Sequence, residues 1–560
     1  MSIPPGMDLP ARAPPSDQLS ADGRPQLGSP RNPNGTPTAR PRRWDLSDIQ
    51  YARLVRIIAL ICLGVGVLLR VVQFGGVPPG LNQDEASIGY DAWNLARFGT
   101  EGNGVHWPVH LISWGDGGNA SYAYMAAPFV AFGLSPFTLR LPMLISSLAS
   151  LFLVWFVIKR LFDERAAWAS AAVVALSPWH VMLSRWALDC NALPFLFLCS
   201  LALLMVSLDA TRKLVWLTIT CVMFGVSVYS YGAAYLAVPI FVLSALALCT
   251  AGGLLTRRQA VIGAAVFALT ALPMALYILV NFFHWDSIHL AGITVPRLPR
   301  TPRFEKQLAA GLLSHVGELL RLLVTQTDGR LYNITDHYGV VYSGIFFAFA
   351  IGLAGVTPVL VVRKRWTLVR LLIPLWIIAC IPTGIVQEPN INRINLLLMA
   401  LVSTVGVALA TVDKWARGTL SVGLISLLAL SGFFARDYFT TQRDRIAVAF
   451  FDGFLPALTY ARNDNPQGGQ ICVTDRVNMP QIYALFDSPS DSEDYVRTVQ
   501  YIWTSTERTG EVISYGPYTF GLQRCDFNRA STVVARRGER VPERFAKSKS
   551  YELFDVYAVR

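Results

Sequence analysis

Charged residues are scarce in this chain: Asp, Glu, Lys and Arg make up 15% of its 560 residues, whereas 53% are hydrophobic. This composition excludes a disordered protein and is typical of a polytopic membrane protein. The net charge of +11 is accompanied by no RNA- or DNA-binding motif. We therefore expect membrane lipids with anionic headgroups as partners, and no nucleic acid.

Cysteine is also sparse, and six of the eight cysteines lie in or beside apolar runs. Cys472 and Cys525 lie in the polar C-terminal region, where an oxidising compartment would permit a disulfide. Their spacing leaves the pairing open. None of the seven histidines has zinc-ligand spacing with an accompanying carboxylate, so no metal is assigned, and a divalent ion near Asp84 stays open.

Long apolar runs recur along most of the chain. A helix needs about 20 apolar residues to cross the hydrocarbon core. The segment 120–134 is shorter than this and predicts a re-entrant or in-plane helix. We predict about eleven membrane spans, at 54–74, 137–158, 166–184, 192–208, 214–231, 235–250, 259–282, 338–362, 368–386, 394–412 and 418–435.

Basic residues in alternate short loops predict the orientation, because Lys and Arg resist translocation. These loops and the N-terminus are then cytoplasmic, in the plasma membrane. The opposite face receives the loops 75–136 and 283–337. The basic residues in question are Lys159, Arg160, Arg165, Arg212, Lys213, Arg257, Arg258, Arg363, Lys364, Arg365, Lys414 and Arg417.

This topology divides the chain into three parts. Residues 1–50, rich in Pro, Gly, Ser and Arg, predict a disordered cytoplasmic tail. Residues 51–435 form the transmembrane part, and we expect its first span to be an uncleaved anchor. Residues 436–560 alternate strand-like runs with a helical stretch, which predicts a small extracytoplasmic α/β domain. That domain has no phosphate loop or nucleophile elbow, so it indicates structural support, or an acceptor-binding or lid role.

An acidic pair, Asp84 and Glu85, follows the first span in QDEASIGYDAWNLARFG. Apolar spacing predicts a short amphipathic helix here that ends at Gly99. Two interpretations stay open. Asp84 is a suitable N-cap and Glu85 suits a first helical turn, or the carboxylates carry chemistry at the outer face.

Two arginines, Arg185 and Arg393, break the charge rule because they fall on the outer side, and a negatively charged ligand would explain this. In SPWHVMLSRWALDCN, Arg185 and Asp189 have the i,i+4 spacing of a helical ion pair. Trp179 and Trp186 would then anchor the headgroup region. In QEPNINRINLLL, Arg393 is either a snorkelling helix-end residue or a phosphate ligand.

Four segments resemble the ordered landmarks of bacterial glycosyltransferase family 39: LNQDEASIGYDAWNL, RLPMLISSL, SPWHVMLSRWALDCN and EPNINR. The family is related to dolichyl-phosphate-mannose protein mannosyltransferases and aminoarabinose transferases. The resemblance covers residues 55–435 and implies a helical GT-C-type fold. It also implies inverting sugar transfer from a polyprenyl-phosphate donor to a glycan, lipid or protein acceptor on the outer face.

The resemblance also assigns residues. Asp84 would be the catalytic base with Glu85 as its partner, and Arg393 would hold the donor phosphate. The further site residues are Arg185 as a second phosphate ligand and Asp189, Asn191, Asn392 and Asp116 in supporting roles. The alternatives are a transporter or flippase of a lipid-linked or anionic solute, a polysaccharide ligase or polymerase, and a non-enzymatic scaffold. A transporter would predict repeat symmetry and polar residues at mid-membrane depth, and we detect no repeat.

Overall fold

The computed structural model describes residues 47–290, 292–299, 312–335, 337–342, 368–465, 468–502 and 511–560. By its internal contacts the chain divides into residues 1–49 and residues 50–560. The first unit, and with it the predicted disordered tail, lies almost entirely outside the described residues. Everything below concerns the second unit and the helix that begins it.

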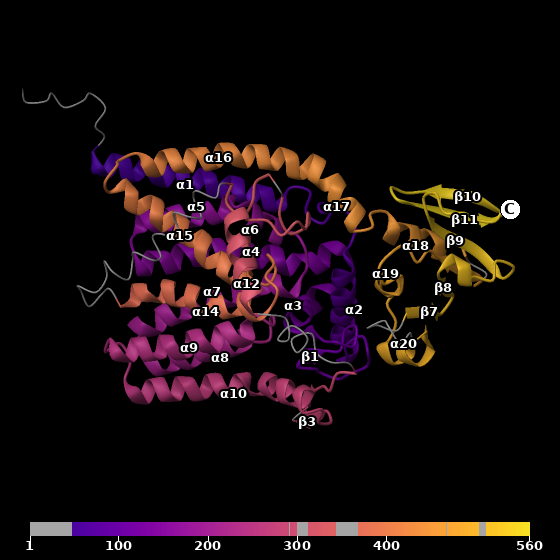
Figure 1. Cartoon of the computed structure of the whole chain (residues 1–560), viewed down its shortest axis with the longest axis horizontal. Coiled ribbons are helices and arrows are strands. Elements are labelled where there is room, and N and C mark those ends of the chain that lie inside the picture. Colours follow the sequence, from indigo (N-terminus) through magenta and orange to yellow (C-terminus); the bar gives the residue numbers. More distant parts are fainter. Residues whose placement is uncertain are drawn as a thin grey trace, which may run out of the picture. The chain divides into compact units, whose positions relative to one another are not determined.

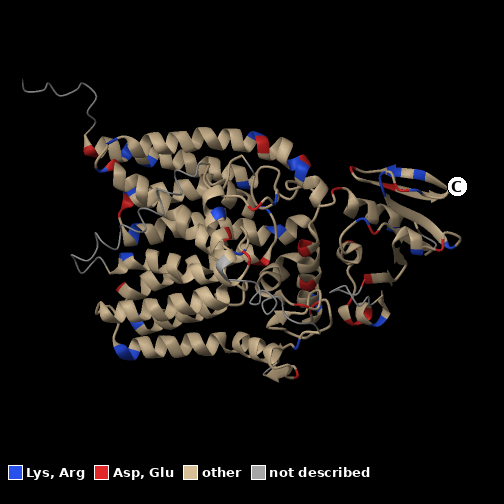
Figure 2. Cartoon of the chain, in the orientation of Figure 1, with Lys and Arg blue, Asp and Glu red and all other residues tan. Residues whose placement is uncertain are grey.

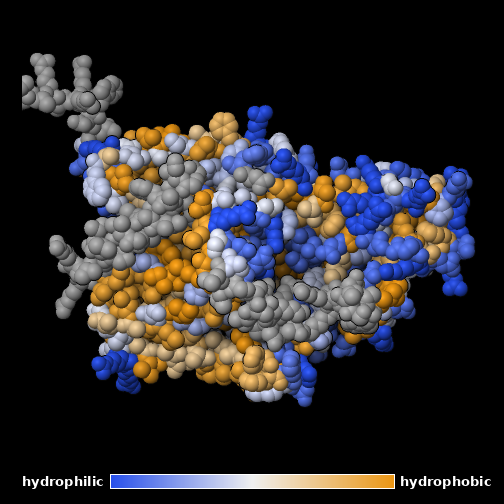
Figure 3. Space-filling view, in the orientation of Figure 1, coloured by the Kyte–Doolittle hydropathy of each residue, from blue (hydrophilic) through white to orange (hydrophobic). Residues whose placement is uncertain are grey.

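Helices long and apolar enough to cross a membrane dominate this unit (Figure 1). At about 1.5 Å rise per residue, 18 residues span roughly 27 Å, close to the hydrocarbon thickness. Apolar side chains cover the surface over α9, α10 and α14, and hydrophilic ones prevail over the C-terminal part (Figure 3). The described residues contain eight such runs: α1 (Asp48–Val71), α4 (Pro136–Leu161), α7 (Asp189–Asp209), α9 (Ala234–Ala251), α10 (Arg257–Phe282), Val369–Val386 with α14 (Leu372–Val386), α15 (Asn395–Asp413) and Thr419–Ala449.

Three predicted spans differ from these eight. The span 166–184 is two helices, α5 (Glu164–Leu176) and α6 (Pro178–Leu183), because Pro178 lacks the N–H that would continue the first helix. The span 214–231 is a 15-residue apolar helix, α8 (Lys213–Ser227). The span 338–362 lies largely outside the described residues. Within 120–134 the structure has a ten-residue helix, α3 (Ser121–Val130), as its length predicted.

The outer segments carry shorter elements. Helix α2 (Gln83–Phe98) follows α1, and a hairpin of β1 (His110–Leu111) and β2 (Gly118–Asn119) follows α2. A second hairpin joins β3 (Ile288–Leu290) and β4 (Ile293–Val295), and α12 (Leu312–Thr325) lies further along. Lys and Arg gather at the left-hand helix ends in Figure 2, and few charges lie along the helix middles.

The C-terminal part is an α/β unit, which confirms the predicted fold class. Its seven-stranded sheet has the order β10-β11-β9-β5-β8-β7-β6. Strand β5 lies parallel to both of its neighbours, and all other pairs are antiparallel. The elements are α18 (Phe454–Asn463), β5 (Gln470–Val473), α19 (Pro480–Asp487), α20 (Ser492–Thr498), β6 (Gln500–Ile502), β7 (Glu511–Tyr515), β8 (Tyr518–Phe520), β9 (Ala530–Arg536), β10 (Phe545–Ser550) and β11 (Phe554–Val559).

The predicted boundary at residue 436 falls inside a continuous helix. Helix α16 (Thr419–Asp437) passes through a π-helical turn, Tyr438–Gln442, into α17 (Arg443–Ala449). No Pro or Gly lies in residues 433–449, so nothing in the sequence ends the helix at 436. The separate α/β unit begins only at α18.

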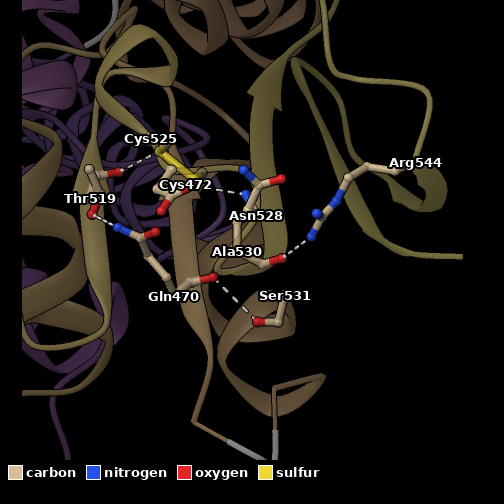
Figure 4. Close-up of a disulfide and its surroundings, with 9 residues drawn as sticks. Gln470, Cys472, Thr519, Cys525, Asn528, Ala530, Ser531 and Arg544 are labelled. Atoms are coloured by element: carbon tan, nitrogen blue, oxygen red, sulfur yellow. Dashed lines mark hydrogen bonds between the residues drawn. A yellow bond between two sulfur atoms is a disulfide. The ribbon is translucent and has the colours of Figure 1, made fainter.

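A disulfide joins Cys472 in β5 to Cys525, with 5.9 Å between their Cα atoms (Figure 4). The Gln470 side-chain amide donates to Thr519 Oγ1 at 2.5 Å, and Ser531 Oγ donates to the Gln470 carbonyl at 3.3 Å. The bond therefore fastens the segment after β8 to the central strand of the sheet.

Helix α2 packs against the C-terminal part, and this contact positions the site. Tyr483 of α19 donates its hydroxyl to the Leu81 carbonyl at 3.0 Å, and the Ser492 N–H donates to Asn94 Oδ1 at 3.0 Å. A Cβ on Gly89 would come within 2.5 Å of the Phe486 ring. Only glycine therefore allows α2 and α19 to approach this closely.

Candidate functional site

A cavity of about 270 Å³ opens where the outer ends of several helices meet. Its walls come from the start of α2, the β1–β2 hairpin, the start of α7 and the segments before α9 and α15. Five of the predicted site residues line it, namely Asp84, Asp116, Asp189, Asn392 and Arg393. The other three, Glu85, Arg185 and Asn191, do not.

One face of α2 forms the acidic wall of the cavity. Asp84, Ser87, Ile88 and Asp91 line it, at the i, i+3, i+4 and i+7 spacing of a single helical face. The N-cap is Asn82, whose side-chain oxygen accepts from the Asp84 N–H at 2.9 Å. The expectation that Asp84 might itself cap the helix is therefore wrong. Asp84 lies in the first turn, where the helix dipole stabilises a carboxylate.

Glu85 points away from the cavity and is fully buried. Its carboxylate accepts two hydrogen bonds of 2.8 Å from Arg140 of α4 and one of 2.7 Å from the Ala187 N–H. Arg140 also donates to the Pro78 carbonyl at 2.8 Å. Glu85 therefore holds α2 against α4 and the segment before α7. Its geometry corrects the expectation of a catalytic partner, because the carboxylate has no access to the cavity.

Arg185 is likewise fully buried. Its guanidinium donates to the carbonyls of Leu69 and Arg70 at 2.7 and 2.9 Å, and to those of Val72 and Gln73 at 2.7 and 3.0 Å. These carbonyls end helix α1, where a cation also complements the helix dipole. The phosphate role expected of Arg185 is not compatible with this placement, since all these donors point into the protein.

Arg70 makes the converse contact. Its guanidinium donates to the Ala175 carbonyl at 2.8 Å, near the end of α5, and lies 2.7 Å from His180 Nδ1. Arg185, which follows α6, therefore donates to carbonyls at the end of α1. Arg70, near the end of α1, donates to a carbonyl near the end of α5.

Asp189 begins α7 and lines the cavity. Arg185 lies after the end of α6, so the two residues are not on one helix. The helix is broken between them, and the predicted i,i+4 ion pair is not formed. Asp189 Oδ2 instead accepts from the Asn119 side chain at 2.7 Å, and the Tyr235 hydroxyl donates to Asn119 Oδ1 at 2.9 Å. This chain of hydrogen bonds fixes the carboxylate in the cavity wall.

Asn191 lies inside the helix packing. Its side-chain oxygen accepts from Asn395 Nδ2 at 3.1 Å, which joins α7 to α15. Trp179 donates to the same Asn395 at 2.9 Å. Both Trp179 and Trp186 are buried, so neither anchors a headgroup region.

Arg393 lines the same cavity and supplies a guanidinium to its wall. The Asn390 side chain accepts from the Arg393 N–H at 2.9 Å, and the Arg393 guanidinium donates to the Glu388 carbonyl at 2.5 Å. About a fifth of the Arg393 side chain remains exposed. Asn392 lines the same wall. The wall of the cavity therefore contains both carboxylates and a guanidinium.

The sequence interpretation missed a second cavity arginine, Arg330. The neighbouring Asp328 carboxylate accepts from Asn333 Nδ2 at 2.8 Å and from the Ile391 N–H at 3.1 Å. This ties the Arg330 segment to the Arg393 segment. Arg330 lies in the predicted outer loop 283–337, which carries several other basic residues, so the charge rule did not single it out. Asp91, on the α2 wall, was missed as well.

No metal site is formed by the protein side chains that the structure describes: nowhere among them do three His, Cys, Asp or Glu residues come together to hold an ion. The described residues therefore supply no set of ligands for a divalent ion near Asp84, and we assign no cofactor.

Comparisons with known proteins bear on the family and the fold of the chain. A family model for dolichyl-phosphate-mannose-protein mannosyltransferases matches residues 121–277. ArnT from Cupriavidus metallidurans in its apo state is similar at a TM-score of 0.51 with 14% identity, over 91% of this chain and 97% of that chain. ArnT bound to undecaprenyl phosphate gives 0.50 with 13% identity, over 91% and 98%. No curated protein sequence matches the chain.

An archaeal enzyme shows the same fold. The Archaeoglobus fulgidus oligosaccharyltransferase, in complex with Zn and sulfate, gives a TM-score of 0.50 with 14% identity, over 86% of this chain and 68% of that chain. The chain therefore shares the fold of these solved structures, and the family model supports the resemblance to family 39 over residues 121–277. Its helices long and apolar enough to cross a membrane make it a multi-pass membrane protein.

Proposed function

We propose that the cavity transfers a sugar from a polyprenyl-phosphate donor to an acceptor hydroxyl at the outer face of the membrane. Asp84 is the general base and Arg393, together with Arg330, holds the donor phosphate. The observation that carries this proposal is that Asp84, in the first turn of α2, and Arg393, in the turn before α15, line one cavity, although 309 positions separate them in the sequence.

The chemistry requires this separation of charge. The donor leaves as a phosphate anion, so fixed cations near the breaking bond stabilise the developing charge. The acceptor hydroxyl must lose its proton as it attacks, which a carboxylate at the attacking side assists. A carboxylate base and a cationic phosphate site in one cavity suit a single displacement with inversion at the anomeric carbon.

The remaining polar residues have supporting roles in this proposal. Asp189, held by Asn119, and Asn392 shape the cavity between the two walls. Asp116 lines it from the hairpin connection. Glu85, Arg185 and Asn191 support the helices behind these walls and do not contact substrate.

The same proposal places the cavity on the extracytoplasmic side of the plasma membrane. Basic residues in the loops at the far helix ends, such as Arg257 and Lys414, support a cytoplasmic position for those ends. A relative of the same fold bound to undecaprenyl phosphate supports a polyprenyl-phosphate donor.

The test is a transfer assay with the purified full chain, a panel of undecaprenyl-phosphate sugars and membrane extract as acceptor source, followed by mass spectrometry. Asp84→Asn should abolish transfer without loss of folded protein. Asp286→Asn is the matched control, because this outer-loop carboxylate is fully exposed and lies outside the cavity. Full activity in Asp84→Asn would refute the base assignment.

A further inference from the structure

A second cavity of about 180 Å³ adjoins the first. The two share Ser87, Asp91, Ser113 and Trp114 in their walls. The second cavity is closed on its other side by the C-terminal part, through residues of α19, Tyr495 of α20 and strands β6 and β7. Together the two cavities approach the size of a ligand site, about 300–1,000 Å³.

Asp91 occupies the shared wall and is 3% exposed. Its Oδ1 accepts from the Gly102 N–H at 2.7 Å. Its Oδ2 is buried and accepts no hydrogen bond from any residue that the structure describes. Leaving a buried polar atom without a hydrogen bond costs free energy. The position of Asp91 Oδ2 therefore indicates a hydrogen-bond partner on a bound ligand.

Glu101, also buried, lies beside Asp91. The Glu101 carboxylate is already engaged by the N–H of Asn103 at 2.7 Å and by the Asn103 side chain at 3.0 Å. Burial, followed by the charge of Glu101, raises the pKa of Asp91 well above its usual value. Asp91 therefore retains its proton more readily than an ordinary aspartate and can donate a hydrogen bond as well as accept one.

We infer that Asp91 is a positioning residue that binds a hydroxyl of a saccharide acceptor, and that the second cavity holds a ring of that saccharide. This inference rests on the function proposed for the first cavity. Asp84 and Asp91 lie seven residues apart on one helix, about 10 Å along its axis. The reacting hydroxyl at Asp84 and the adjoining ring at Asp91 then belong to one acceptor.

The composition of the second cavity favours a sugar over other acceptors. Trp114, Tyr90, Tyr495 and Tyr501 line it. Aromatic rings present apolar faces to the C–H faces of a sugar and keep polar edges for its hydroxyls. Gln481 adds an amide that can donate and accept. A hydroxyl-rich ligand is matched by these groups together with Asp91.

The test measures binding rather than turnover. Saturation-transfer NMR on the detergent-purified full chain would use p-nitrophenyl glycosides of mannose, galactose, N-acetylglucosamine and arabinofuranose, with a ten-residue Ser/Thr peptide and p-nitrophenol as comparison probes. We expect at least one glycoside to bind and the peptide and p-nitrophenol not to bind. Asp91→Ala should weaken glycoside binding about tenfold or more, as for a lost hydrogen bond to a buried group.

Two further variants separate positioning from structure. Asp91→Asn keeps an oxygen for the Gly102 N–H and gains a donor, so it should retain glycoside affinity. Asp494→Ala, which removes an exposed carboxylate of α20, should bind as the parent chain does. Glycoside binding undiminished in Asp91→Ala, no glycoside binding to the parent chain, or binding of the peptide instead would overturn the inference.

The affinity for undecaprenyl phosphate, measured in the same samples, distinguishes failure of the inference about Asp91 from failure of the proposed function. Asp91→Ala should leave that affinity unchanged. If Arg393→Ala also leaves it unchanged, the phosphate assignment fails, and the result for glycosides stands on its own.

Discussion

Glu85 and Arg140 form a two-point ion pair in which neither side chain has any exposure to solvent. The neighbouring Asp84 faces the cavity. Two adjacent carboxylates therefore have different surroundings, and substitutions should separate their effects.

Glu85→Ala should destabilise the protein severely. Removing one member of a buried ion pair leaves an uncompensated charge, which costs about 3–5 kcal/mol. The measurement is the denaturation midpoint of the detergent-purified chain. Replacing both Glu85 and Arg140 by Leu should recover part of the loss. A normally stable Glu85→Ala protein without activity would instead support a catalytic role.

Asp84→Asn should fold normally and lose transfer. The loss of general-base assistance is worth roughly 10²–10⁴-fold in rate. Steady-state kinetics should place the effect in kcat, with the donor KM little changed. The denaturation midpoint, measured beside Asp286→Asn, should stay at the parent value.

Arg393→Ala should weaken use of the donor. A hydrogen bond to a charged group contributes about 1.5–3 kcal/mol, which corresponds to a roughly tenfold to hundredfold change. Arg330→Ala should act in the same direction, and Arg393→Lys should retain part of the activity because Lys keeps the charge without the planar fork. Unchanged donor KM and kcat in Arg393→Ala would exclude the phosphate role.

The Cys472–Cys525 bond should protect both thiols from alkylation until a reductant is added, as mass spectrometry of peptides would show. The bond closes 53 residues, for which chain entropy predicts about 4 kcal/mol of stabilisation. Replacing both cysteines by Ala should lower the stability of the C-terminal part by this order. Ready alkylation without a reductant would contradict the pairing.

Stability should fall as pH rises, through Asp91 and Glu101. Burial raises the pKa of both carboxyls, and the charge of Glu101 raises the pKa of Asp91 further. The native state therefore holds protons that the unfolded chain releases above about pH 4, so stability declines with rising pH. Asp91→Asn should flatten this decline between pH 5 and 8. Parallel curves for the variant and the parent chain would rule out this linkage.

The sequence predicted the elements that follow from periodicity and composition. The apolar runs became helices, and the strand-like runs of the C-terminal part became a sheet. Breaks within a helix were harder to predict, because the length of 166–184 concealed the effect of Pro178. Helix α16 also continues beyond residue 436, because polar residues such as Arg436 are good helix formers once the chain leaves the apolar layer.

The site was only partly predictable, since residue type does not reveal direction. Arg185 and Arg393 broke the same charge rule, yet one points into the protein and the other into the cavity. Asp84 and Glu85 are adjacent, and a helix directs neighbouring side chains about 100° apart. Asp91 lies within the segment LNQDEASIGYDAWNL, but nothing in the sequence singled it out, and it drew attention only because it lines both cavities.

The exchange of contacts between Arg185 and Arg70 connects the structure with the order of synthesis. Leu69 precedes Arg185 by 116 residues, and Arg70 precedes Ala175 by 105. A growing chain therefore inserts its first helix long before the partners of that helix exist, and the carbonyls at its end await a side chain not yet made. Chains that stop before residue 185 leave α1 incomplete. The end of the first helix and the α5–α6 segment can therefore complete each other's hydrogen bonds only after both have been made.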